Sequence, residues 1–67
     1  MDIKISTEFI KLDQLLKFAG VVGHGSDAKI LIFEEEVSVN GEIATQRGKK
    51  IRPGDVVKVG EEILNVC

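Results

Sequence analysis

The most concentrated chemical feature of the sequence is a run of basic side chains in its last third. Arg47, Lys49, Lys50 and Arg52 fall within six residues, and no acid stands among them. Guanidinium and ammonium groups both bind phosphate, arginine through a planar fork and lysine as a point charge. A run of like charge is more often only a solvated loop, so the rest of the sequence has to decide between these two interpretations.

Side chains that could carry out catalysis are few. The chain has one histidine, His24, one cysteine, Cys67, and neither Tyr nor Trp. A side-chain nucleophile needs a base beside it, and these residues form no such pair. The carboxylates show no spacing typical of a catalytic pair, and no glycine-rich nucleotide-binding motif occurs. We therefore expect no enzymatic activity, no metal site and no cofactor.

The length of 67 residues fits one domain, residues 1–67. Apolar residues make up 43% of the chain, too many for a disordered protein. No apolar run approaches the roughly 20 residues of a membrane helix, and one cysteine permits no internal disulfide. These features favour a cytoplasmic protein with no membrane partner.

Charge is segregated along the chain. The net charge of −2 argues by itself against a nucleic-acid partner. Distribution matters more than the sum, because salt screens surface fields beyond about 10 Å. Acids cluster at Glu34, Glu35 and Glu36, whereas the bases cluster in residues 47–52.

A first helix is expected after a short strand at residues 2–5. Ser6-Thr7-Glu8 resembles a helix start with a hydroxyl cap, and Gly20 is placed to end the helix. Its buried stripe, at helical spacing, consists of Phe9, Leu12, Leu15, Leu16 and Ala19. Lys11, Gln14 and Phe18 share a second face, where we expect Phe18 to pack into the small core.

A second, shorter helix follows a connection that contains Gly23, His24 and Gly25. It should open at Ser26-Asp27 and end near Glu34 or Glu35. Its inward stripe consists of Ala28, Leu31 and Ile32. The two helices therefore form a helix-loop-helix unit.

From Val37 the pattern changes to a period of two, which predicts strands at residues 37–39, 42–44, 56–59 and 62–66. Asn40-Gly41 favours a type I′ hairpin, because both central residues need positive φ. Pro53-Gly54 fits the centre of a type II turn, and Gly60 opens a second hairpin. The expected fold is α+β, in the order β-α-α-β-β-β-β, with the helix pair packed on a small, mostly antiparallel sheet.

Four segments in this order resemble a known family. They are Leu12-Asp13-Gln14-Leu15-Leu16-Lys17, Ser26-x-x-Lys29-x-Leu31-Ile32, Val37-x-Val39-Asn40-Gly41 and Arg52-Pro53-Gly54-Asp55-Val56-Val57. Together they resemble the alpha-L RNA-binding domain, also called the ribosomal protein S-four-like domain, and especially its small stand-alone bacterial members. The resemblance covers roughly residues 8–59.

The resemblance implies binding of structured RNA, rRNA or tRNA, by shape and phosphate contacts, with a role in ribosome assembly or translation. It implies RNA-binding residues on the helices, namely Lys11, Gln14, Lys17, Lys29 and His24, and in the loop, namely Arg47, Lys49, Lys50 and Arg52. The start of the second helix, at Gly25 and Ser26, offers free N–H groups to a phosphate.

The sequence departs from the family pattern in two places. Glu35 stands where the family has a glycine, and a left-handed conformation there costs on the order of 1 kcal/mol. Lys11 stands in a segment where many relatives carry Arg, and a lysine lacks the bidentate grip.

A protein–protein adaptor on the same fold is the alternative function. It would dock a basic partner through acidic side chains, namely Glu34, Glu35, Glu36, Glu42, Glu61 and Glu62. RNA affinity and its salt dependence distinguish the two.

Overall fold

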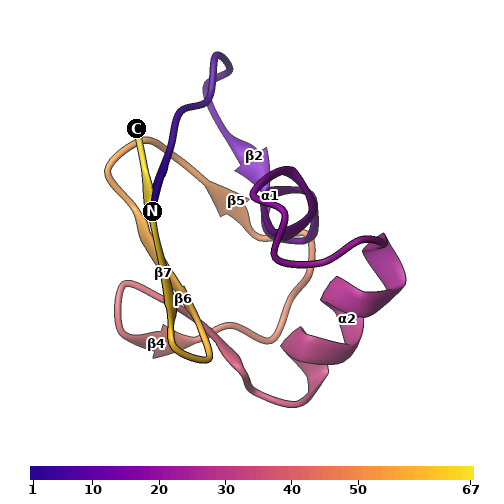
Figure 1. The fold of residues 1–67 in the computed structure, drawn as a ribbon. Helices are drawn as coiled ribbons and strands as arrows, with labels where there is room; N and C mark the ends of the chain where they lie inside the picture. The colour runs from indigo at the N-terminus through magenta and orange to yellow at the C-terminus, as the bar shows by residue number, and fades with distance from the viewer.

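Apolar residues recur at helical spacing in the first half of the chain and at strand spacing in the second half. The helices and most of the strands of the structure follow this change. The computed structural model describes residues 1–67 (Figure 1). In chain order the elements are β1 (Asp2–Ile3), β2 (Ile10–Lys11), α1 (Leu12–Phe18), α2 (Gly25–Phe33), β3 (Val37–Val39), β4 (Glu42–Ile43), β5 (Lys50–Ile51), β6 (Val56–Val59) and β7 (Glu62–Val66). The expected α+β fold is confirmed, with two additional short strands, β2 and β5.

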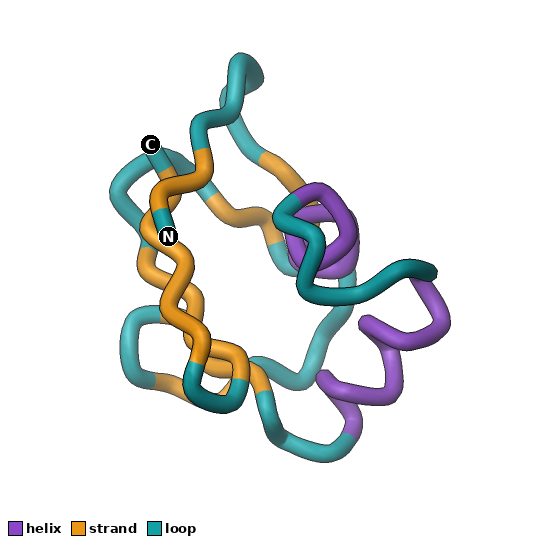
Figure 2. Tube along the Cα trace, in the orientation of Figure 1, coloured by secondary structure: helices purple, strands orange, loops and turns teal.

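Five strands form one sheet in the order β1-β7-β6-β3-β4, and β2 pairs with β5 as a separate two-stranded ladder. All pairs are antiparallel except β1 with β7, which is parallel. This pairing brings the two ends of the chain together, as Figure 2 shows, and the terminal ammonium of Met1 donates to the Ile63 carbonyl at 2.9 Å.

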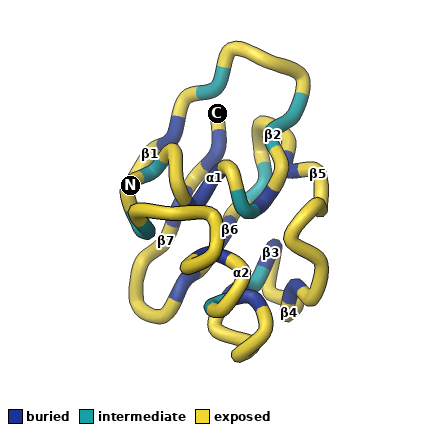
Figure 3. Tube along the Cα trace, turned by 90° about the vertical axis from the view of Figure 1, so that its right-hand side faces the viewer, coloured by how far each residue is buried: buried dark blue, intermediate teal, exposed yellow.

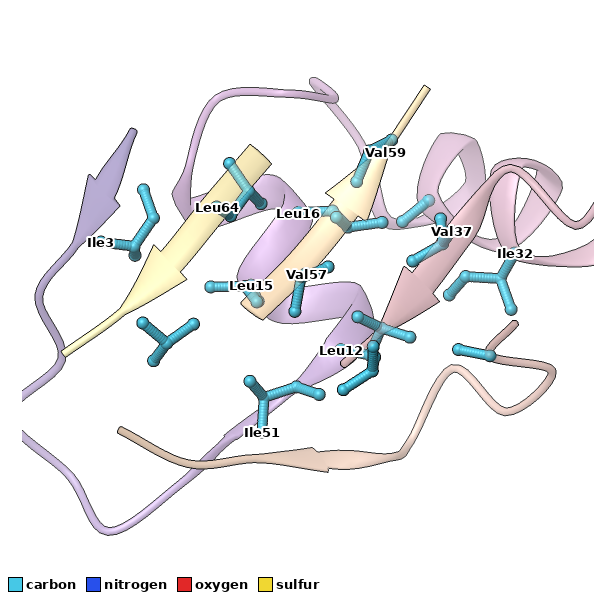
Figure 4. Packing of buried hydrophobic residues seen from close by; sticks show 14 residues of the cluster. Ile3, Leu12, Leu15, Leu16, Ile32, Val37, Ile51, Val57, Val59 and Leu64 are labelled. Atoms are coloured by element: carbon cyan, nitrogen blue, oxygen red, sulfur yellow. The ribbon is translucent and has the colours of Figure 1, made fainter. Parts of the chain in front are cut away.

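The core lies between the helices and one face of the sheet (Figure 4). Residues alternate along β6 and β7, so that Val57, Val59, Leu64 and Val66 point inward. They meet α1 and α2 through Leu12, Leu15, Leu16, Ala28 and Ile32. The buried set is entirely apolar. The core therefore rests on shape and the hydrophobic effect, with no buried polar network.

Both predicted hairpins are present with the turn geometry that their residues favour. Asn40 and Gly41 have φ of 51° and 87°, and Val39 pairs with Glu42 across a two-residue turn. Gly60 has φ of 59° between the paired Val59 and Glu62. Gly54 has φ of 100°, and the Asp55 N–H donates to the Arg52 carbonyl at 3.0 Å, as in a type II turn.

The predicted start of the first helix at Ser6-Thr7-Glu8 is wrong. These residues form a bend, Thr7 donates locally to the Phe9 carbonyl at 2.8 Å, and α1 begins only at Leu12. The reason is tertiary: Ile10 and Lys11 are extended because they pair with β5. Phe9 consequently lies outside the helical stripe and is only partly buried.

Both helices end in a Schellman motif. After α1, Gly20 has φ of 77°, and the Gly20 and Val21 amides donate to Lys17 and Leu16 at 3.1 and 3.0 Å. After α2 the same pattern uses Glu35, with φ of 61°, while the Glu35 and Glu36 amides donate to Ile32 and Leu31 at 3.2 and 3.1 Å. Glu35 therefore adopts a left-handed conformation, with the cost of about 1 kcal/mol given above.

A polar latch joins the turn of the first hairpin to the turn before β6. Asn40 donates from Nδ2 to Asp55 Oδ1 at 3.1 Å and accepts from the Val56 amide at 2.9 Å. The second carboxylate oxygen of Asp55 accepts from the Arg52 amide at 2.8 Å. The bond from Arg52, followed by that from Asn40, lowers the pKa of the Asp55 carboxyl.

Replacing Glu35 with glycine should raise the free energy of unfolding by about 1 kcal/mol, because glycine adopts positive φ without the Cβ clash. Denaturant unfolding should show a higher midpoint at unchanged slope. Glu34→Gly is the matched control: Glu34 has φ of −83°, so glycine there relieves nothing and should destabilise. If glycine stabilised the protein equally at both positions, the left-handed conformation of Glu35 would not be the source of the gain.

Replacing Asp55 with Asn should lower the free energy of unfolding by about 1 kcal/mol at neutral pH, because one acceptor of the latch becomes a donor. The lowered pKa means that the carboxylate stabilises the fold fully above its unfolded value of about 3.9. That contribution is lost as the pH falls through the lowered folded value.

The difference between the two proteins should therefore be constant at neutral pH and shrink below about pH 4, as measured by denaturant unfolding at a series of pH values. Glu61→Gln, at the exposed turn between β6 and β7, is the control and should show no such change. An Asp55→Asn difference independent of pH would contradict a role for the charge.

Candidate nucleic-acid interface

The basic loop is fastened by its backbone to the start of α1. The Leu12 amide donates to the Lys49 carbonyl at 2.9 Å, and the Asp13 amide donates to the Arg47 carbonyl at 3.0 Å. The first amides of a helix have no partner within it, so the loop carbonyls here take the place of a side-chain cap. Arg47 and Lys49 are therefore held beside α1 by main-chain bonds that do not use their side chains.

The β2–β5 ladder sets two lysines against each other. Lys11 lies opposite Lys50, and their neighbours Ile10 and Ile51 pair in the same register. Ile51 is fully buried and anchors this ladder in the core. Like charges directly opposite each other destabilise a sheet. Lys11 and Lys50 therefore weaken the fold unless an anion lies between them.

Lys50 makes one further contact, with an aromatic ring. Its Nζ lies 4.8 Å from the centroid of the Phe9 ring, within the range of a cation–π interaction. Phe9 thus orients the lysine, although it lies outside α1. No ion pair of Lys50 with a carboxylate competes for the ammonium.

The starts of the two helices differ. At α1 the Gln14 amide is also occupied, because it donates to the Asp13 carboxylate at 2.8 Å. At α2 the N-cap residue His24 makes no side-chain cap bond, and the amides of Gly25 and Ser26 donate to no group of the chain. Free amides at a helix start suit an anion, so the geometry agrees with the phosphate site predicted there, which stays a prediction.

Side chains of α2 and of the basic loop also meet at one hollow. Lys29 from α2 and Arg47 from the loop line one hollow, together with Ile32, Phe33 and Thr45. The hollow brings together two of the predicted RNA-binding residues from segments far apart in the sequence.

The remaining predicted site residues are not gathered in this way. Gln14 and Lys17 are exposed on α1 and His24 is exposed at the N-cap of α2, and none of the three lines a hollow with a residue of the basic loop. Arg52 is exposed, but its amide donates to the Asp55 carboxylate, so a negative charge lies beside it. Lys11, Arg47 and Lys50, around the start of α1, are therefore better candidates for phosphate contacts than Arg52.

Exposed apolar side chains on the helices were missed or misplaced from the sequence. Phe18 is 63% exposed, so the prediction that it packs into the core is wrong. Phe18 is the last residue of α1, whose buried residues are Leu12, Leu15 and Leu16. Ile30 and Phe33 are 54% and 78% exposed, and neither was singled out. The signal was available, since both lie off the inward stripe of α2. Most of α2 is coloured as exposed in Figure 3.

The acidic side chains gather elsewhere. Glu35 and Glu36 line a separate hollow with Ser38, Ile43, Lys58 and Gly60. The Gly60 amide donates to the Glu36 carbonyl at 3.1 Å, which brings the turn with Glu61 to the same end of the sheet. Glu42 is the exception, because it shares a hollow with Lys49. The charge segregation seen along the sequence is thus largely kept in space.

No group of three or more His, Cys, Asp or Glu side chains is arranged to hold a metal ion. Neither helix has the length and apolarity needed to cross a membrane.

Known proteins resemble the chain in sequence and in structure. The family model described as S4 domain matches residues 3–67. A protein of Bacillus subtilis (strain 168), "Probable ribosome maturation protein RlbA", is 47% identical over 57 residues, which are 85% of this chain and 80% of that protein.

A solved structure described as "Crystal structure of pseudouridylate synthase" superposes with a TM-score of 0.73 at 28% identity, over 84% of this chain. The chain spans only 24% of that protein, so the likeness concerns one part of it. The match of the family model to residues 3–67, together with the fold described above, shows that this protein belongs to the S4 domain family.

Proposed function

We propose that the chain binds structured RNA without catalysis, through the face formed by α1, the start of α2 and the basic loop. The observation that carries the proposal is the arrangement around the start of α1. Lys11 and Lys50 face each other across the β2–β5 ladder, and the backbone of Arg47 and Lys49 is fixed to the helix amides. The repulsion between Lys11 and Lys50 destabilises the fold. Such repulsion is expected at a site where a bound anion offsets it.

The physical character of this face suits RNA helices. Double-stranded RNA is recognised mainly by its shape and by phosphate and 2′-hydroxyl contacts, because its major groove is too narrow for a helix to read. Both helices of this protein are short, and neither presents a long polar face for groove insertion. The cations on the two helices and on the docked loop would instead contact phosphates from outside the groove.

The comparisons support an RNA connected with the ribosome. The Bacillus subtilis relative is named as a probable ribosome maturation protein. The rRNA is therefore the first candidate, with tRNA second, and action in the cytoplasm follows from such a role. The synthase activity named for the structural relative is not carried over, because this chain matches only 24% of that protein.

A protein adaptor is the second candidate function. It is favoured by the hollow in which Glu35 and Glu36 meet the exposed Ile43 at the edge of the sheet. Such a surface would suit a basic partner with an apolar side chain. The RNA-binding proposal does not use this end of the molecule, so the two can be tested separately.

The RNA proposal predicts a steep salt dependence. If about four phosphates are engaged, affinity for a structured RNA should fall by about a hundredfold between roughly 50 and 200 mM salt. Lys49→Ala/Lys50→Ala should bind more weakly and lose only about tenfold over the same range, because two counterion-releasing contacts are gone. Fluorescence anisotropy with stem-loops from rRNA and tRNA gives both affinities.

Lys4→Ala/Lys58→Ala is the matched control, because it removes the same charge from exposed lysines outside the basic loop. It should keep the wild-type salt slope. Equal losses in both double variants would point to net charge instead of a site. No binding to any RNA, with a protein pull-down that Glu35→Gln/Glu36→Gln abolishes, would decide for the adaptor.

A further inference from the structure

We infer that the hollow between α2 and residues 45–47 receives an unpaired nucleobase, which stacks on Phe33 while Lys29 and Arg47 hold the adjoining phosphates. The inference rests on the proposed function and adds the class of RNA: one that presents an unpaired base beside a helix. Fully paired RNA would then be bound by phosphate contacts alone.

Phe33 is not needed by the fold. It is the last residue of α2 and is 78% exposed, the largest exposure among the large apolar side chains. Its neighbour Ile32 points into the core and is 3% exposed. An aromatic ring left in water at the mouth of a hollow offers a flat apolar surface to a ligand, and a nucleobase is the ligand whose faces match it.

The charges around the ring favour a nucleotide. Lys29 precedes Phe33 by one helical turn, so both lie on the same side of α2. Arg47 forms another wall, and no carboxylate lines the hollow. An apolar side chain of a protein partner would cover Phe33 but leave these cations unpaired at a dry contact, which is costly. A base with its phosphate satisfies both the ring and the cations.

The remaining polar group in the hollow is the Thr45 hydroxyl. A hydroxyl both donates and accepts hydrogen bonds, so it can contact the edge of whichever base is stacked. This mode of contact predicts a preference for unpaired over paired RNA and only a weak preference among bases, because every base has a stacking face.

The hollow also adjoins the site proposed above. Arg47 bonds through its carbonyl to the Asp13 amide, at the start of α1, while its side chain faces α2. A helical stem lying along Lys11 and Lys50 would therefore place its loop or bulge toward Phe33. Arg47 thus connects the proposed phosphate-binding site at α1 with the proposed stacking site at Phe33.

The test compares two RNAs, a stem-loop whose loop is unpaired adenosines and the same stem as a continuous duplex. Wild type should prefer the stem-loop by about tenfold, the range expected for one stacked base. Phe33→Leu keeps an apolar side chain but loses the flat ring, and should abolish the preference while leaving duplex affinity and its salt slope unchanged. Phe33→Trp should retain it.

Phe18→Leu is the matched control, because Phe18 is also exposed at the end of a helix but does not line the hollow. It should behave as wild type. The inference is overturned if wild type binds both RNAs equally, or if Phe18→Leu loses the preference as Phe33→Leu does. Salt-dependent duplex binding without a loop preference leaves the proposed function standing, whereas absence of binding to either RNA overturns both.

Discussion

The docking of the basic loop onto the start of α1 is the constraint on which the rest of the surface depends. Two main-chain bonds, from the Leu12 and Asp13 amides to the Lys49 and Arg47 carbonyls, complete the helix start that no side chain caps. The buried Ile51 then holds the following strand in the core. The backbone carbonyls of Arg47 and Lys49 make these bonds, so their side chains are not used to hold the loop in place, and the position of the loop relative to α1 is still defined.

This arrangement places cationic side chains close to one another on one face of the molecule. Lys11 and Lys50 face each other, and Lys29 and Arg47 line one hollow, while most glutamates lie at the other end of the sheet. A small domain buries a limited share of its surface, so such repulsion is a noticeable part of its stability. The proposed RNA-binding role would account for this repulsion, since phosphates would attract the same charges.

The stability of the fold is instead supplied by features away from this face. The core is wholly apolar, and the Asn40–Asp55 latch fixes the two turns that flank β3 and β6. Against this, Glu35 holds a left-handed conformation, which is costly for a residue with a Cβ. The strain lies at the acidic end, where Glu35 and Glu36 line a hollow with the exposed Ile43. The chain therefore has two chemically distinct ends on one small scaffold.

Local signals in the sequence determined much of this protein. The Asn40-Gly41 and Gly60 turns, the Gly20 helix end and the inward positions of both helices from Leu12 onward are all set by interactions within a few residues, where φ preference and periodicity act directly. Tertiary structure alone decided the late start of α1, the β2–β5 ladder, the exposure of Phe18 and the meeting of Lys29, Phe33 and Arg47. Each of these depends on contacts between segments far apart in the chain, and such contacts can override a nearby cap or stripe because they bury apolar surface and satisfy main-chain amides that the local sequence leaves free.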